Sequence, residues 1–252
     1  MPFTTVSDKT ARMQQYMKAL DYYIEHTTFP IVFVENSNTD ISQFYKDALH
    51  SNRLEIITFN GNSNKSKGKG YGEALIIEHA LNNSKMISKN SIVVKITGRL
   101  IVENIVKVLK CHFPLQSRNT IICSFNSDLT FPDSRLFIAP TSFLNKFLLD
   151  KELIDDKKNI YFEHILAQTI LKANIPYAPF WEEPVIIGIS GTTGKIYEAP
   201  HMTKSRNIRY KLMALHRYHL YSCKTGKQQL LKTIVYTLLQ LKFSLLKIIN
   251  KE

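Results

Sequence analysis

Short apolar runs alternate with stretches of helical periodicity along the first 200 residues, and this alternation restricts the possible folds more than any other feature of the chain. Runs rich in β-branched and aromatic residues predict buried strands at residues 31–34, 54–59, 91–96 and 120–124. Apolar residues at helical spacing predict helices at residues 11–25, 41–49, 73–81, 142–149 and 161–172. Such a chain is expected to form an α/β fold, with a mostly parallel sheet flanked by helices.

The positive charge is concentrated at the C-terminal end. The formal net charge is +12, but residues 203–252 hold eleven Lys or Arg and one acidic residue, whereas residues 1–202 hold 22 basic and 20 acidic residues. Nucleic-acid-binding domains carry a basic face within the folded body, and none of their sequence signatures is present. The sequence therefore predicts a nearly neutral domain over residues 1–200, a basic helical tail over residues 201–252, and no nucleic-acid partner.

The cysteines and the first residues indicate a cytoplasmic protein. Cys111, Cys123 and Cys223 lie far apart and form no CxxC pair, a pattern typical of reduced thiols rather than of a disulfide framework or a zinc site. The opening residues MPFTTVSDKT show no basic segment followed by an apolar one, so no secretory signal is predicted.

Polar clusters follow each of the predicted strands or the turn after it, at residues 35–40, 65–73, 97–99 and 128–135. In an open α/β sheet, ligands bind outside the carboxyl ends of the strands. We therefore expect the four clusters to converge on one crevice, which is the main functional prediction from pattern alone.

The glycine-rich segment at residues 67–72 (KGKGYG) is a candidate phosphate site. It opens a predicted helix, so free backbone N–H groups and the positive end of the helix dipole would face a ligand. Its spacing matches neither a P-loop nor a GxGxxG motif. A surface turn with solvated lysines is the alternative interpretation.

Two of the clusters carry side chains suited to an anion or a metal. Arg99 ends the third predicted strand and can pair through two hydrogen bonds with a phosphate, or with a carboxylate of the chain itself. Asp133 shares a loop with Asp128 and Arg135, and is a candidate ligand for a divalent metal or for sugar hydroxyls. Aspartate is also a common turn residue, which is the alternative for each of them.

Later segments offer a general base and a lid. Glu163 lies early in a predicted helix and is a candidate general base, or a carboxylate favoured there by the helix dipole. His164 is assigned to the acceptor side of the site, with a structural or solvent-facing role as the alternative. The turn SGTTGK, which holds Ser190, Gly191 and Lys195, is a candidate lid over a ligand or an ordinary glycine-rich turn.

The elements ENS, GKGYGE, KITGR, DSR, EH and SGTTGK, in this order and spacing, resemble GT-A-like glycosyltransferases, and more closely the bacterial enzymes that build capsular polysaccharide and O-antigen. The resemblance covers roughly residues 12–200. It implies a hexosyltransferase with a nucleotide diphosphate sugar as donor, a UDP-sugar being expected. It also implies that Glu163 is the base that deprotonates the acceptor hydroxyl, as in inverting members. The nucleotide-sugar-binding residues that it implies are Glu35, Asn36, Ser37, Lys67, Gly70, Gly72, Thr97 and Gly98.

The third strand departs from the GT-A pattern. GT-A enzymes normally end this strand in Asp-x-Asp, which holds the metal that bridges the diphosphate, whereas this chain has Lys95-Ile-Thr-Gly-Arg99. Either Arg99 neutralises the leaving diphosphate directly, or Asp133 supplies a ligand for Mn²⁺ or Mg²⁺. Both arrangements place a fixed cation where charge develops as the glycosidic bond breaks.

The tail is expected to bring the protein to a membrane. Residues 228–249 form an amphipathic helical pattern with lysines inside the run, which makes a poor transmembrane span and favours a helix lying in the interface. The preceding basic residues Lys204, Arg206, Arg209, Lys211 and Arg217 would attract anionic lipid. The predicted partners are thus a lipid-linked glycan acceptor and the inner face of the cell membrane. The alternatives for the helix are packing on the protein's own core and homodimerisation.

Two other functions are compatible with parts of this pattern. A sugar-nucleotide nucleotidyltransferase would use a related crevice, but it would need a basic glycine-rich loop near the first strand, where this chain has the acidic ENSNTD. A non-catalytic membrane-associated module is the other alternative.

Overall fold

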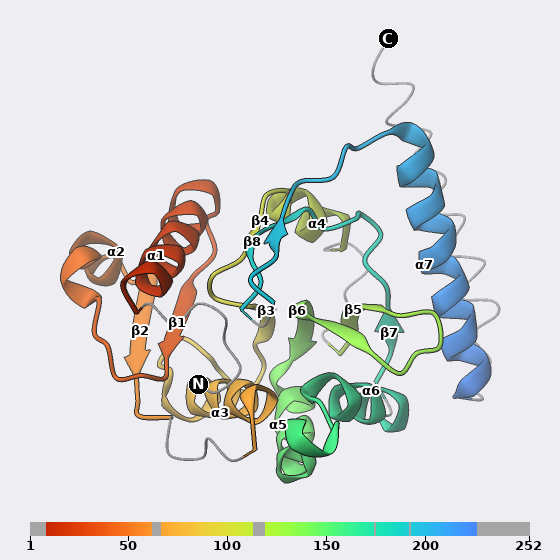
Figure 1. The fold of residues 1–252 in the computed structure, drawn as a ribbon, viewed down its shortest axis with the longest axis horizontal. Coiled ribbons are helices and arrows are strands. Elements are labelled where there is room, and N and C mark those ends of the chain that lie inside the picture. Colours follow the sequence, from red (N-terminus) through yellow and green to blue (C-terminus); the bar gives the residue numbers. More distant parts are fainter. Residues whose placement is uncertain (1–8, 62–66, 113–118, 174, 192, 226–252) are drawn as a thin grey trace.

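The predicted alternation of strands and helices is present in the computed structural model, which describes residues 9–61, 67–112, 119–173, 175–191 and 193–225 (Figure 1). The helices are α1 (Lys9–His26), α2 (Lys46–His50), α3 (Lys69–Asn83), α4 (Ile105–His112), α5 (Thr141–Leu149), α6 (Phe162–Lys172) and α7 (Lys204–Lys224), and short 3-10 turns lie at Ser42–Phe44, Lys151–Leu153 and Asp156–Lys158. The strands are β1 (Ile31–Glu35), β2 (Leu54–Thr58), β3 (Ile92–Ile96), β4 (Ile101–Val102), β5 (Ile121–Phe125), β6 (Pro132–Pro140), β7 (Tyr177–Ala178), β8 (Ile186–Ile189) and β9 (Ile196–Tyr197).

The predicted elements are confirmed at most positions. The four strands expected from apolar runs are β1, β2, β3 and β5, and the helices expected at residues 11–25, 73–81, 142–149 and 161–172 are α1, α3, α5 and α6. The segment at residues 41–49 divides into a 3-10 turn and the short helix α2. Helix α4 follows β4 and was not predicted from the sequence.

The prediction of a mostly parallel sheet is wrong, because the central sheet is mixed. Its order is β3-β6-β5-β7, and β6 runs antiparallel to both of its neighbours, whereas β5 and β7 are parallel. Strands β1 and β2 form a separate parallel pair, and β4, β8 and β9 form a small antiparallel sheet. Residues 132–135 (PDSR) have the composition of a turn, which concealed β6 in the sequence.

The two faces of the central sheet are buried under different helices. Alternate residues such as Ile121 and Phe137 pack toward α3, α5 and α6, while their neighbours Ile122 and Ile138 pack toward α4. This two-residue period is the one expected for a strand that is covered on both faces. A third hydrophobic cluster joins α1 to β1 and β2.

Helix α7 runs along one side of the central sheet (Figure 1) and packs on the same core. The rings of Tyr177 and Tyr221 lie 4.9 Å apart, and the Tyr221 hydroxyl donates a hydrogen bond to the carbonyl of Ile175 at 3.2 Å. Residues 204–224 thus share their core with the sheet. The amphipathic helix predicted at residues 228–249 lies outside the described residues. Within the described ranges, no helix is long and apolar enough to cross a membrane.

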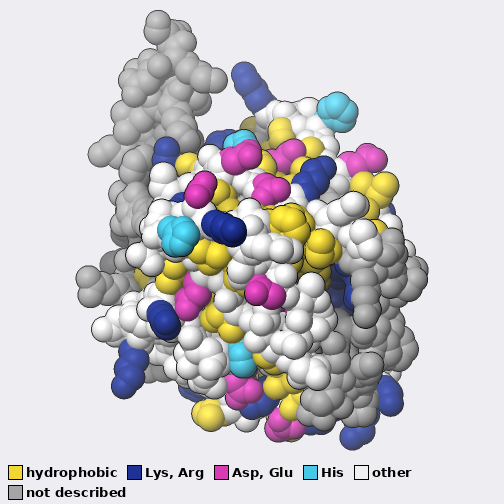
Figure 2. Space-filling view, turned by 90° about the vertical axis from the view of Figure 1, so that its left-hand side faces the viewer, with side chains coloured by type: hydrophobic (Ala, Val, Ile, Leu, Met, Phe, Trp, Pro, Cys, Tyr) yellow, Lys and Arg dark blue, Asp and Glu magenta, His cyan; other side chains and the backbone are white. Residues whose placement is uncertain are grey.

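The side of the molecule that carries α1 and α2 shows acidic and basic side chains interspersed with exposed apolar ones (Figure 2). This mixture agrees with the near balance of 22 basic and 20 acidic residues over residues 1–202.

Candidate functional site

A cavity of about 1260 Å³ lies between two parts of the chain. On one side are the C-terminal ends of β3 and β5 and the N-terminus of α6, and on the other are the segment that leads into and out of β9 and the helix α7. Three of the four predicted polar clusters contribute to its walls, through Gly70 and Glu73, through Thr97 and Arg99, and through residues 133–135. The antiparallel strand β6 brings its first residues to the same place as the last residues of its neighbours. The remaining predicted residues that line the cavity are Glu163, Ser190, Gly191 and Lys195.

Arg99 supplies a buried positive charge to this cavity. Only 7% of the residue is exposed, and within the described ranges no carboxylate or carbonyl pairs with its guanidinium group. The group lies directly over the turn, since a Cβ placed on Gly191 would be 1.5 Å from Nη2. A buried cation without an acidic partner is unfavourable by itself, so this position favours an anionic ligand.

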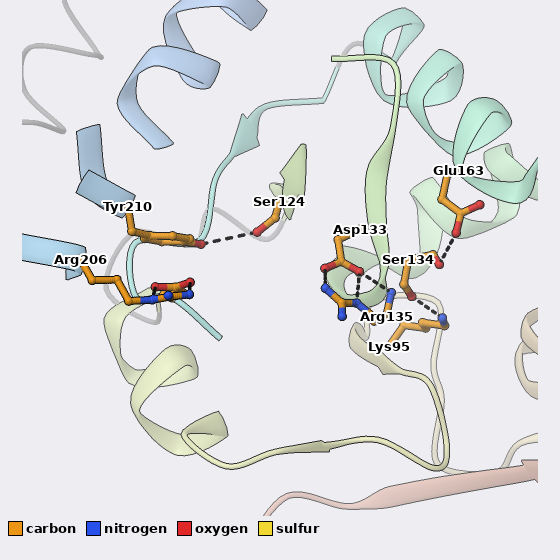
Figure 3. Close-up of polar contacts among 9 residues, drawn as sticks. Lys95, Ser124, Asp133, Ser134, Arg135, Glu163, Arg206 and Tyr210 are labelled. Atoms are coloured by element: carbon orange, nitrogen blue, oxygen red, sulfur yellow. Dashed lines mark hydrogen bonds and ion pairs between the residues drawn. The ribbon is translucent and has the colours of Figure 1, made fainter. Parts of the chain in front are cut away.

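Asp133 is engaged by the chain itself. Its carboxylate accepts hydrogen bonds from the Arg135 backbone N–H at 3.0 Å, from Nε at 2.9 Å and from Nη2 at 2.7 Å (Figure 3). Hydrogen bonding with Asp133 raises the pKa of Arg135, whose guanidinium also lies over the Tyr197 ring. Among the described residues, no group of three or more His, Cys, Asp or Glu side chains could hold a metal ion. The Asp133 carboxylate is thus bound to Arg135, and a metal ion at this position would have to compete with that pair.

Glu163 lines the same cavity at the start of α6, where it is bound to β6. Its Oε1 accepts a hydrogen bond from the Ser134 hydroxyl at 2.6 Å (Figure 3). Burial raises the pKa of Glu163 and the nearby Glu73 raises it further, while the Ser134 hydrogen bond and Lys95 act in the opposite direction. A carboxyl with a raised pKa in a cavity has the properties of a general acid or base.

The glycine-rich segment is occupied by a carboxylate of the protein. Asp156 accepts hydrogen bonds from the backbone N–H groups of Lys69 at 2.6 Å and of Gly70 at 3.0 Å. These N–H groups were predicted to be free for a phosphate, and the structure shows that they are already bound. Gly68, at a φ of 99°, and Gly70 permit this close approach, because a Cβ on either would lie within 3 Å of the Asp156 side chain. The glycines thus serve a helix cap.

Lys67 also has partners within the chain and is not among the residues lining the cavity. Its ammonium group donates to the Glu152 carboxylate at 2.5 Å and lies 4.7 Å from the centre of the Tyr71 ring. The predicted contact of Lys67 with a nucleotide would therefore require this ion pair to open.

The remaining predicted binding residues lie away from the cavity walls. Glu35, Asn36 and Ser37 follow β1, and the Glu35 carboxylate accepts from the backbone N–H groups of Ser37 and Thr39, both at 2.8 Å. His164 accepts from the Tyr161 backbone N–H at 3.2 Å, which supports the structural alternative for this residue. Gly72 and Gly98, which were also predicted to bind the nucleotide sugar, do not line the cavity either. Gly98 packs against Tyr16 of α1.

Helix α7 forms one wall of the cavity, which the sequence did not reveal. Arg206, Tyr210 and Arg217 line it, and Arg206 binds the Glu183 carboxylate through Nε at 3.0 Å and Nη2 at 2.7 Å. Burial raises the pKa of Tyr210 to about 12, so its phenol stays protonated, 3.5 Å from the Ser124 hydroxyl (Figure 3). The helical spacing of residues 206, 210 and 217 could have shown that they share a face, but not what that face meets.

Comparisons of the chain with protein-family models, with curated proteins and with solved structures find no match. The assignment of an activity accordingly rests on the residues of the site.

Proposed function

We propose that this protein is a glycosyltransferase that transfers a hexose-type sugar from a nucleotide diphosphate donor, with a UDP-sugar as the expected donor, to a lipid-linked glycan in bacterial surface polysaccharide synthesis. The observation that carries the proposal is the presence, in one cavity, of the buried Arg99, which has no acidic partner in the described chain, and of the partly buried carboxyl of Glu163. The first suits an anionic leaving group, and the second suits the removal of a proton.

The proposed step uses both residues. The acceptor hydroxyl oxygen bonds to the anomeric carbon of the donor while the bond from that carbon to the diphosphate oxygen breaks. The hydroxyl proton passes to the Glu163 carboxylate, and the nucleoside diphosphate leaves with the electron pair of the broken bond. Arg99 offsets the charge that develops on the diphosphate. Deprotonation of the acceptor by a carboxylate corresponds to the inverting route.

The same proposal places the protein at the inner face of the cell membrane, where the lipid-linked acceptor would be found. Supporting it are the six Lys and Arg residues of α7, which carries no acidic residue. Ile208 and Leu212 on this helix are about three-fifths exposed, at 60% and 61%. Basic and exposed apolar side chains together are the combination expected of a helix near an anionic lipid surface.

Nucleotide binding tests the anion site. We expect UDP to raise the melting temperature of the wild-type protein and to have no such effect on Arg99→Gln. Arg209→Gln is the matched control, since it removes the same charge from a residue outside this cavity. Stabilisation by RNA alone would refute the proposal, and stabilisation of Arg99→Gln equal to that of the wild type would remove Arg99 from the site.

Turnover tests the reaction itself. A panel of UDP-, GDP- and TDP-linked sugars is screened for hydrolysis and for transfer, with and without EDTA. We expect Glu163→Gln to lose turnover at least about a hundredfold and to keep its affinity for UDP, while Glu25→Gln, an exposed change on α1, behaves as the wild type. Release of pyrophosphate from a nucleoside triphosphate and a sugar phosphate would instead show a nucleotidyltransferase.

A further inference from the structure

Four side chains from four separate motifs meet at the part of the cavity that Glu163 lines. Glu73 comes from α3, Lys95 from β3, Ser134 from β6 and Glu163 from α6. Lys95 forms an ion pair with Glu73 and donates a hydrogen bond to the backbone carbonyl of Ser134. The Ser134 hydroxyl in turn donates to Glu163 Oε1 at 2.6 Å (Figure 3). The four form one continuous chain of contacts.

The Lys95 ammonium group is fully used in this chain. Its three N–H groups have three acceptors, namely the Glu73 carboxylate, the Ser134 carbonyl and, at 3.3 Å, the Thr97 hydroxyl. Only 11% of the side chain is exposed. Lys95 therefore has no capacity left for a ligand. Its contacts hold the backbone of Ser134 in place.

We propose that Ser134 is a positioning residue for Glu163, with Lys95 and Glu73 as its support. This inference deepens the proposed function and rests on it for the role of Glu163. The Ser134 hydroxyl fixes Oε1 and thereby orients the carboxylate, leaving Oε2 to receive the proton of the acceptor hydroxyl. Ser134 is itself 8% exposed, so its hydroxyl is held in a buried position with little freedom to turn away.

The charges around Glu163 explain why its hydrogen-bond donor is the neutral hydroxyl of Ser134. Glu73 faces it from α3 and Lys95 faces it from β3, and these two are paired with each other. Their effects on Glu163 are opposite in sign and offset one another. The Ser134 hydroxyl then stabilises the ionised carboxylate by a hydrogen bond and leaves its negative charge in place. A direct ion pair with a Lys or Arg would neutralise that charge.

The inference is tested by following the carboxyl carbon of Glu163 by NMR in the full-length protein labelled with ¹³C-glutamate, the signal being assigned with Glu163→Gln. In Ser134→Ala, the pH midpoint of this signal is expected to move upward by about one unit, because a hydrogen bond to the ionised form is lost. Ser134→Thr keeps a hydroxyl and is expected to restore the midpoint toward that of the wild type. Ser124→Ala, the same change elsewhere in the cavity, should leave it in place.

The rate of hydrolysis of the sugar nucleotide that the wild type turns over gives the second readout. In Ser134→Ala, kcat should fall about tenfold, KM for the donor should stay within about twofold, and the acidic limb of the pH profile should move upward with the NMR midpoint. An unchanged midpoint in Ser134→Ala overturns the positioning role. Absence of turnover of every donor by the wild type overturns the proposed function instead, while the NMR result still decides whether Ser134 controls Glu163.

Discussion

Replacement of Gly191 by alanine should weaken diphosphate binding without unfolding the protein, because the added methyl group falls where the Arg99 guanidinium lies. A Cβ at this position would be 1.5 Å from Nη2, 2.2 Å from Cζ and 2.6 Å from Nη1. Non-bonded heavy atoms approach to about 3.5 Å, so the guanidinium has to move by about 2 Å. Gly191 does not have a positive φ, and its backbone therefore accepts alanine.

Gly191→Ala is expected to weaken binding more than it lowers the stability of the fold. The displaced atoms are the end of a long side chain, which can turn away at a cost of about 1 kcal/mol. A diphosphate would lose its charge-assisted hydrogen bonds to Arg99, worth about 1.5–3 kcal/mol. The dissociation constant is therefore expected to rise about 10- to 150-fold.

Isothermal titration with inorganic pyrophosphate and with UDP measures this change, since pyrophosphate reports on the diphosphate site independently of the base. Thr193→Ala is the control, because this exposed residue belongs to the same turn but does not line the cavity. Wild-type affinity in Gly191→Ala, together with lost affinity in Arg99→Gln, would show that the guanidinium binds from another position. Wild-type affinity in both variants would refute an anion site at Arg99.

Three further predictions concern the α3 cap, the titration of Glu163 and the C-terminal tail. Asp156→Ala should lower the free energy of unfolding by about 1 kcal/mol in urea denaturation, because it removes the cap of α3; an unchanged value would contradict the capping role. Because the native pKa of Glu163 is raised, its contribution to stability is complete below the ordinary glutamate range and is lost as the pH rises through the native pKa. The free energy of unfolding of Glu163→Gln should accordingly vary less with pH across that window, and parallel curves for the two proteins would argue against it. Truncation after residue 225 removes the predicted amphipathic helix but leaves α7 complete, so it should weaken sedimentation with membranes while UDP binding persists; an unchanged membrane fraction would place the attachment on the part of the chain that remains.

Local composition was sufficient to predict the strands that precede the site. Runs such as residues 31–34 and 91–96 are apolar, β-branched and short, and β1 and β3 begin and end within a residue of the predicted bounds. Arg99 and Glu163 line the cavity because one follows a strand and the other starts a helix, which are positions that a sequence reveals. The prediction of a crevice at the strand ends required only these local patterns and no knowledge of contacts between distant segments.

Contacts between distant segments could not be predicted in the same way. The carboxylate that occupies the N-terminus of α3 comes from Asp156, 86 residues after Gly70, and no local pattern announces it. The glycines of residues 67–72 look the same whether they admit a phosphate or a carboxylate of the protein. The sequence likewise gives no sign that the side chain of Arg135, two residues later in an extended strand, binds the Asp133 carboxylate.

The antiparallel direction of β6 has a consequence for how the site could vary between related proteins. Three adjacent residues, Asp133, Ser134 and Arg135, reach the cavity from one strand whose pairing with β3 is fixed at Ile96 and Leu136. Insertion or deletion of one residue within this strand would exchange its two faces and separate Ser134 from Glu163. Length changes should therefore be rejected within residues 132–140, whereas single substitutions in the strand alter the site one contact at a time.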